Sequence, residues 1–88
     1  MGNGKMLMII TEKGHEVSKA ITQKTPRGVT IIPAEGAYTG EGREMLVCVV
    51  RAPEVSNIKK IIQAIDPKTF IIVSEANEIL GKGFNKSI

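Results

Sequence analysis

The residues best suited to chemistry in this sequence are glycines, hydroxyls and cations gathered in a few short segments. Glycine lets backbone N–H groups approach and cradle an anion, and Arg43 and Lys82 add positive charge near these segments. Tyr38 offers both a stacking face and a hydroxyl. The candidate ligand-binding residues are Arg27, Gly28, Thr30, Gly36, Tyr38, Thr39, Gly40, Gly81 and Gly83. The same segments are also typical of plain turns, where glycine supplies a positive φ, and both interpretations stay open.

The sequence lacks the residue patterns that catalysis and metal binding require. His15 and Cys48 are the chain's single His and Cys, too few for a His/Cys metal cluster. Cys48 stands in an apolar run and is predicted to be a buried small hydrophobe, while His15 falls on the polar side of an amphipathic segment. The carboxylates show no spacing that indicates acid–base work. We therefore predict no catalytic residue, no metal, no cofactor and no enzymatic activity.

Composition excludes several other classes of protein. The chain has 88 residues, a net charge of +3 and 42% hydrophobic residues, so it is too apolar for a disordered tail. Its three aromatic residues, Tyr38, Phe70 and Phe84, are too few to form a nucleic-acid stacking platform. Its apolar runs are too short to span a bilayer. Because of the few aromatic residues, we expect that the protein does not bind nucleic acid. Because it has a single cysteine and no apolar leader behind a basic start, we expect it to be cytoplasmic.

Hydrophobic periodicity predicts alternating strands and helices. Unbroken or β-branched apolar runs indicate strands, and apolar residues recurring at helical spacing indicate two amphipathic helices. The expected strands are 6–10, 29–32, 44–51 and 69–74, the expected helices are 13–25 and 53–65, and 75–80 is expected to form a short extra strand or one helical turn. Pro33 is expected to end its strand or place it at an edge. A glycine-rich connection, 35–43, is expected to join the second and third strands.

The order β-α-β-β-α-β predicts an α+β fold of the ferredoxin-like kind. In this arrangement a four-stranded antiparallel sheet carries two helices on one face. Residues 1–88 form one domain, in which 1–4 are expected to be flexible or foreign to the domain and 85–88 to be a polar tail. The other face of the sheet is also expected to be apolar. A large uncovered apolar face is uncommon on a monomer, so we predict that a second subunit covers it.

Several segments in this order resemble a known family. They are Arg27-Gly28-Val29-Thr30, Glu35-Gly36-Ala37-Tyr38-Thr39-Gly40, Ile65-Asp66-Pro67 with Phe70, and Glu78-Ile79-Leu80-Gly81-Lys82-Gly83-Phe84. Together they are similar to the uncharacterised C-terminal domain of YitT-type bacterial membrane proteins, domain of unknown function 2179. The resemblance implies a ferredoxin-like fold of the PII-like kind and a parent protein with transmembrane helices. It implies no established activity. PII-like proteins oligomerise and bind small anionic ligands between subunits.

These observations together predict a non-catalytic regulatory or sensory module. We expect a homo-oligomer that binds a small anionic metabolite or nucleotide at loops near a subunit interface, at the inner face of the membrane when part of a full-length protein. The alternative is a pure oligomerisation or docking domain for the transmembrane portion of its parent protein, with no ligand.

Overall fold

The computed structural model describes residues 4–40, 42–77 and 79–81, and within them the strands and helices follow the predicted order. The elements are β1 (Gly4–Thr11), α1 (Gly14–Lys24), β2 (Thr30–Glu35), β3 (Gly42–Arg51), the 3₁₀ turn η1 (Ala52–Glu54), α2 (Val55–Ile65) and β4 (Phe70–Ala76). The four strands form one antiparallel sheet in the order β2-β3-β1-β4. This is the ferredoxin-like topology that the sequence predicts.

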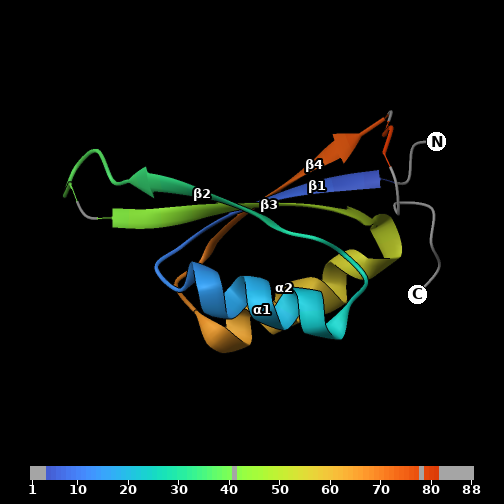
Figure 1. Cartoon of the computed structure of the whole chain (residues 1–88), viewed down its shortest axis with the longest axis horizontal. Helices are drawn as coiled ribbons and strands as arrows, with labels where there is room; N and C mark the ends of the chain where they lie inside the picture. The colour runs from blue at the N-terminus through green and yellow to red at the C-terminus, as the bar shows by residue number, and fades with distance from the viewer. Residues whose placement is uncertain (1–3, 41, 78, 82–88) are drawn as a thin grey trace.

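Both helices lie on the same face of the sheet, and the core fills the space between the two layers (Figure 1). Alternate residues of β1 and β3 point into this space, and each helix adds an apolar stripe. The hydrophobic core consists of Leu7, Ile9, Val17, Ile21, Leu46, Cys48, Val50, Ile58 and Ile62. Cys48 is buried as predicted, and burial raises the pKa of its thiol to about 11, so at neutral pH it is a protonated core residue.

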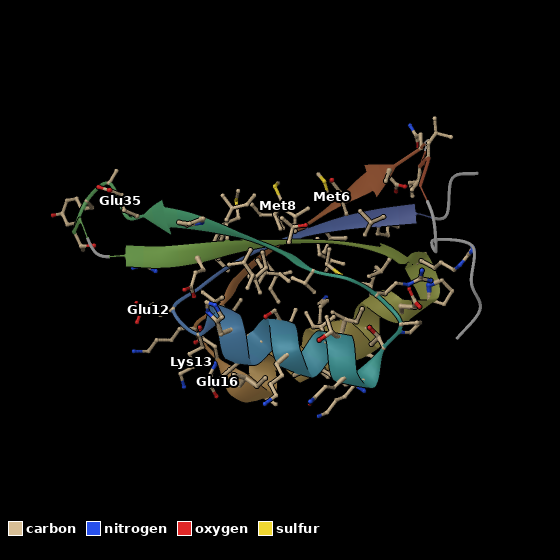
Figure 2. The ribbon with its side chains drawn as sticks, in the orientation of Figure 1. Met6, Met8, Glu12, Lys13, Glu16 and Glu35 are labelled. Carbon is tan, nitrogen blue, oxygen red and sulfur yellow. The ribbon has the colours of Figure 1, made fainter. Side chains whose placement is uncertain are left out.

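The opposite face of the sheet is apolar and carries no element from the described part of the chain (Figure 1). We call it the open face. Figure 2 shows Met6 and Met8 pointing away from the helices. The strand register places further apolar residues on the same side, and the set is Met6, Met8, Ile10, Ile32, Met45, Val47, Val49, Phe70 and Ile72.

The structure corrects several predicted boundaries. Gly4 is not part of a flexible start, because it is buried in β1 between Arg51 and Ala76, its partners on the two neighbouring strands. Residues 1–3 and the predicted polar tail, 85–88, lie outside the described residues. Pro33 lies within β2, which is an edge strand and so tolerates a residue without an N–H.

The C-terminal part of the sheet also differs from the prediction. No separate element begins at Glu75, because β4 continues through Glu75 and Ala76 by pairing with Lys5 and Gly4. Among the described residues that follow, 77 and 79–81, no helix or strand forms.

Candidate functional site

The hairpin of β2 and β3 projects beyond the helix layer and ends in a glycine-rich turn (Figure 1). The turn is closed by the N–H of Gly40, which donates to the carbonyl of Gly36 over 2.7 Å. Gly40 has φ of +72°, a left-handed conformation that glycine adopts without the strain of a side chain. The side chain of Tyr38 is fully exposed at the tip. The turn therefore holds an aromatic ring in solvent on a short, constrained loop.

An open groove of about 500 Å³ lies beside this hairpin, on the open face of the sheet. One row of paired residues crosses three strands there, because Ile10 of β1 pairs with both Met45 of β3 and Phe70 of β4. These side chains line the groove together with residues of the hairpin. Among the described residues the lining is Ile10, Ala34, Glu35, Gly36, Ala37, Tyr38, Thr39, Arg43, Met45, Lys68 and Phe70. The groove thus combines an apolar floor with the polar turn.

Among the described residues three charged side chains line the groove, and two of them are cationic. The cations are Arg43 and Lys68, and the carboxylate in the described lining is that of Glu35. Figure 2 shows Glu35 at the hairpin. Arg43 also approaches Glu12, with 3.8 Å between its Nη1 and the Glu12 Oε2, and both side chains are substantially exposed. An ion pair this long and this exposed contributes little. Arg43 therefore stays available to a bound anion, and the lining has a small positive balance.

Two exposed aromatic rings flank the groove. Phe70 is 63% exposed although it belongs to a strand, and Tyr38 is fully exposed. Aromatic faces of this kind stack on planar ligands, and a phenol adds a hydrogen-bonding group. The combination of two rings and two cations suits a planar or partly apolar anion better than a simple inorganic ion.

Asp66 fixes the position of Lys68 and Phe70. Its carboxylate accepts a hydrogen bond from the hydroxyl of Thr11 (2.6 Å) and another from the backbone N–H of Lys68 (3.0 Å). The Thr11 hydroxyl, followed by the Lys68 N–H, stabilises the charged form and holds the pKa of Asp66 below its ordinary value, against the opposing effect of burial. The bonds join the end of β1 to the turn that precedes β4, on the side of the groove away from the hairpin.

Of the predicted ligand-binding residues, three line the groove. They are Gly36, Tyr38 and Thr39, and Gly40 closes the same turn. Gly81 is described but follows β4, and its neighbour Ile79 approaches Gly4 at the far end of the sheet. Gly83 lies outside the described residues. Within one chain the structure therefore does not bring all of the predicted residues together.

Arg27 and Gly28 lie on the connection from α1 into β2 and Thr30 is the first residue of β2, and none of the three belongs to the groove lining. The guanidinium of Arg27 is buried and its Nε donates to both carboxylate oxygens of Glu54, over 3.0 and 3.2 Å. Glu54 also accepts the N–H of Arg51, so this ion pair braces η1 against the connection. Gly28 is exposed, and Thr30 is an exposed residue opposite Val47. In this chain Arg27 has a structural contact where the sequence suggested an anion-binding role.

Sequence reasoning missed Lys68 and Phe70. Lys68 precedes the last strand and Phe70 begins it. Because side chains alternate along a strand, both residues are expected on the same side as Ile72. An aromatic residue and a cation on one exposed strand face were the signal that could have revealed them. His15 behaves as expected, exposed on α1 with its Nδ1 3.7 Å from the Glu44 carboxylate.

Comparison with known families identifies relatives across most of the chain. The family described as "Uncharacterized protein conserved in bacteria (DUF2179)" matches residues 27–81. The UPF0750 membrane protein YvjA of Bacillus subtilis is 45% identical over 83 residues, which are 94% of this chain and 30% of that protein. The UPF0750 membrane protein YitT of the same organism is 39% identical over 74 residues, 84% of this chain and 26% of that protein. The chain thus spans less than a third of these relatives.

Solved structures share the fold. A DUF2179 protein from Eubacterium ventriosum is 30% identical, with a TM-score of 0.68 over 81% of this chain and 97% of that chain. The PII protein of Arabidopsis thaliana bound to citrate has 19% identity and a TM-score of 0.69, covering 81% and 75% of the two chains. CPII from Thiomonas intermedia K12, bound to ADP, AMP and acetate, has 18% identity and a TM-score of 0.63, covering 89% and 93%. The last two show the fold alone.

Proposed function

Because the chain belongs to the DUF2179 family, and curated relatives are membrane proteins, we propose that it is a non-catalytic regulatory domain of a membrane protein. The domain binds a small, partly planar anion, such as a nucleotide or a carboxylate metabolite, in the groove beside the β2–β3 hairpin. It acts as a homo-oligomer at the cytoplasmic face of the membrane. None of its helices in the described residues is both long and apolar enough to cross a bilayer.

The observation that carries this proposal is the composition of the groove. An apolar floor, two exposed aromatic rings and the cations Arg43 and Lys68 converge on one hollow of about 500 Å³. Small-molecule sites are usually concave, mostly apolar and fitted with a few polar groups that orient the ligand. Structural neighbours have been solved with citrate and with ADP, AMP and acetate. A shared fold is a weak argument for a shared function, so those ligands serve as probes.

The open face supports assembly with a second copy. Nine apolar side chains lie on it, while the helices cover only the other face. Water-exposed apolar surface of this extent costs free energy that a partner would recover. The groove opens on this same face. A second copy seated there would border the bound ligand, and this supports the proposal of a site near a subunit interface.

Ligand binding is tested by thermal unfolding of the chain with ADP, AMP or citrate at a fixed protein concentration. A ligand at one hundred times its Kd stabilises the folded state by about 2.7 kcal/mol. For a domain of this size each kcal/mol raises Tm by roughly 4–8 °C. We expect at least one probe to raise Tm, and we expect R43Q/K68Q to lose the rise. The matched control, K24Q/K59Q, removes two exposed cations on the helices and should keep it.

Two outcomes would contradict the binding proposal. One is the absence of any shift with every probe at concentrations that saturate millimolar sites. The other is a shift that R43Q/K68Q and K24Q/K59Q weaken equally, since that would indicate general charge attraction.

A pure docking domain without a ligand is the second candidate, and the extent of the open face favours it. The apolar surface continues along β1 and β3 well beyond the groove, through Met6, Met8 and Val49. In this case R43Q and Y38A leave self-association unchanged, and no probe alters Tm. Analytical ultracentrifugation of these variants, combined with the thermal assay, separates the two functions.

A further inference from the structure

The outer surface of the helix layer carries an excess of lysines. Among the exposed residues of α1 and α2 and the residue before α1, there are five lysines and one glutamate, a net charge of +4. We call this surface the lysine face, and it consists of Lys13, Lys19, Lys24, Lys59 and Lys60 with Glu16. The whole chain has a net charge of only +3. Its positive charge is therefore concentrated on the side opposite the apolar open face.

Helical geometry directs two of these lysines straight away from the sheet. Lys19 lies about 180° around α1 from the stripe formed by Val17 and Ile21, and Lys60 lies likewise opposite Ile58 and Ile62, at about 100° per residue. The two helices pack side by side in one layer (Figure 1). Their outward lysines thus project from a common surface.

In the described chain these lysines form no ion pair with a carboxylate, although the Thr11 hydroxyl and, less strongly, Lys13 lower the pKa of the nearby Asp66 carboxyl. Among the described residues, no ion pair within 4.0 Å involves a member of the lysine face. Lys13 donates a hydrogen bond to the carbonyl of Ile65 at the end of α2, over 3.3 Å. The other exposed residues of the two helices are His15, Ala64 and uncharged polar residues such as Thr22, Gln23, Ser56 and Gln63. The charges of Lys19, Lys24, Lys59 and Lys60 therefore face solvent without a paired carboxylate among the described residues.

We propose that the lysine face docks on the anionic headgroups of a phospholipid bilayer. The inference rests on the proposed place of the domain beside a membrane. Lysine ammonium groups act as point charges that suit a diffuse anionic surface, whereas recognition of individual phosphates usually employs arginine forks. No arginine or aromatic residue lies among the exposed positions of the two helices in the described chain, which disfavours nucleic acid.

This docking fixes the orientation of the domain. With the helices against the headgroups, the open face and the groove point away from the bilayer, where a second copy and a soluble ligand can reach them. Weak attraction is sufficient for a tethered domain, because the tether holds the surface at an effective millimolar concentration. Each lysine near an anionic surface strengthens binding about fivefold, and salt weakens it.

The test is sedimentation of the chain with vesicles of phosphatidylcholine alone or of phosphatidylcholine mixed with phosphatidylglycerol. We expect binding to the mixed vesicles only, lost on raising the salt concentration. K19E/K60E should weaken this binding by more than tenfold. The matched control R43E/K68E changes the net charge by the same amount on the other side of the molecule and should bind much more tightly than K19E/K60E. Circular dichroism checks that both variants fold.

Four results would overturn the proposal. They are no vesicle binding by the native chain, equal binding to the two kinds of vesicle, equal losses in the two double variants, and binding to polyglutamate but not to phosphatidylglycerol, which would assign the face to an acidic protein. The thermal shift with ADP or citrate is measured on the same proteins without vesicles. If K19E/K60E keeps the shift while vesicle binding is absent from the native chain, only the docking proposal fails and the ligand-binding function stands.

Discussion

Gly14 shows how one missing side chain allows α1 to start. Its backbone N–H donates to the Glu44 carboxylate over 2.9 Å, which satisfies one of the unpaired N–H groups at the helix start. A Cβ on Gly14 would lie 2.8 Å from the Cβ of Glu44, closer than real contacts allow. We expect Gly14→Ala to destabilise the fold by about 1–3 kcal/mol, as overpacking does.

The control for this prediction is Gly28→Ala. An added Cβ on Gly28 meets no atom within 4 Å, and its φ lies outside the left-handed region. The same substitution there should be neutral or stabilise by up to about 1 kcal/mol, because alanine reduces the entropy of the unfolded chain. Urea unfolding measures both variants, and equal midpoints for the two would show that the Glu44 contact does not matter.

Asp66 makes stability depend on pH in a defined direction. Its pKa is lowered in the folded state, chiefly by the Thr11 hydroxyl, so the folded protein favours the carboxylate. The contribution is complete above the pKa of the unfolded chain, about 3.9, and is lost as pH falls through the lower folded value. Asp66→Asn should cost about 1.5–3 kcal/mol at neutral pH, the range for hydrogen bonds to a charged group.

The check is a series of urea unfolding curves from neutral pH down to acid. The difference between the native chain and Asp66→Asn should shrink as Asp66 becomes protonated in both states. A difference that stays constant across this range would rule out the ionised carboxylate as its source. Lys68→Ala retains the backbone N–H that bonds Asp66, and it should leave the pH dependence nearly unchanged.

At the scale of elements, the loop of the β2–β3 hairpin lines the groove and lies apart from the core. None of its described loop residues, 36–40, belongs to the buried core, and the turn projects beyond the helices. Replacing residues 36–41 by Asn-Gly, a favoured two-residue hairpin turn, removes Gly36, Tyr38 and Thr39 from the groove. We expect Tm without ligand to change by only a few degrees, and the thermal shift with ADP or citrate to disappear. A large loss of Tm would show that the loop supports the fold.

Hydrophobic periodicity predicted the elements because the same residues form the core. The β1 and β3 runs are apolar on both sides, and both helices carry one apolar stripe, so their type and order follow from local spacing. Strand ends were less predictable, since Gly4 and Ala76 join the sheet through pairing with each other across distant parts of the chain. Local sequence holds no information about such partners.

The candidate site was predictable only in part, for the same physical reason. Tyr38 and its glycines lie in one loop, so their proximity follows from sequence. The sequence suggested that Arg27 binds an anion. In the structure its guanidinium instead forms an ion pair with Glu54, which lies 27 positions further along the chain. Lys68 and Phe70 join the hairpin only through the pairing of β4 with β1 and of β1 with β3. Which residues of different strands lie side by side depends on the strand pairing, which the local sequence does not specify.

At the scale of the whole molecule, the two sides differ in character. The helix side presents lysines, while the open face presents aliphatic side chains, methionines and Phe70. Val47 lies on an inner strand of the open face, between Met8 of β1 and Thr30 of β2. A charge at this position would be solvated in an isolated chain and buried without a partner in an assembly through this face.

We therefore expect Val47→Glu to dissociate the assembly and leave the fold intact. Burying an unpaired carboxylate in each copy costs several kcal/mol, which lowers the association constant at least a thousandfold on the scale of about 1.4 kcal/mol per tenfold change. Light scattering measures the mass, and circular dichroism measures the helix content. Thr22→Glu adds the same charge to the exposed side of α1 and should not alter the mass.

In an assembly, the urea midpoint of the native chain also rises with protein concentration, whereas that of Val47→Glu does not. A native chain that stays monomeric at every concentration, or a Val47→Glu variant with native mass, would show that the open face is not where the copies meet.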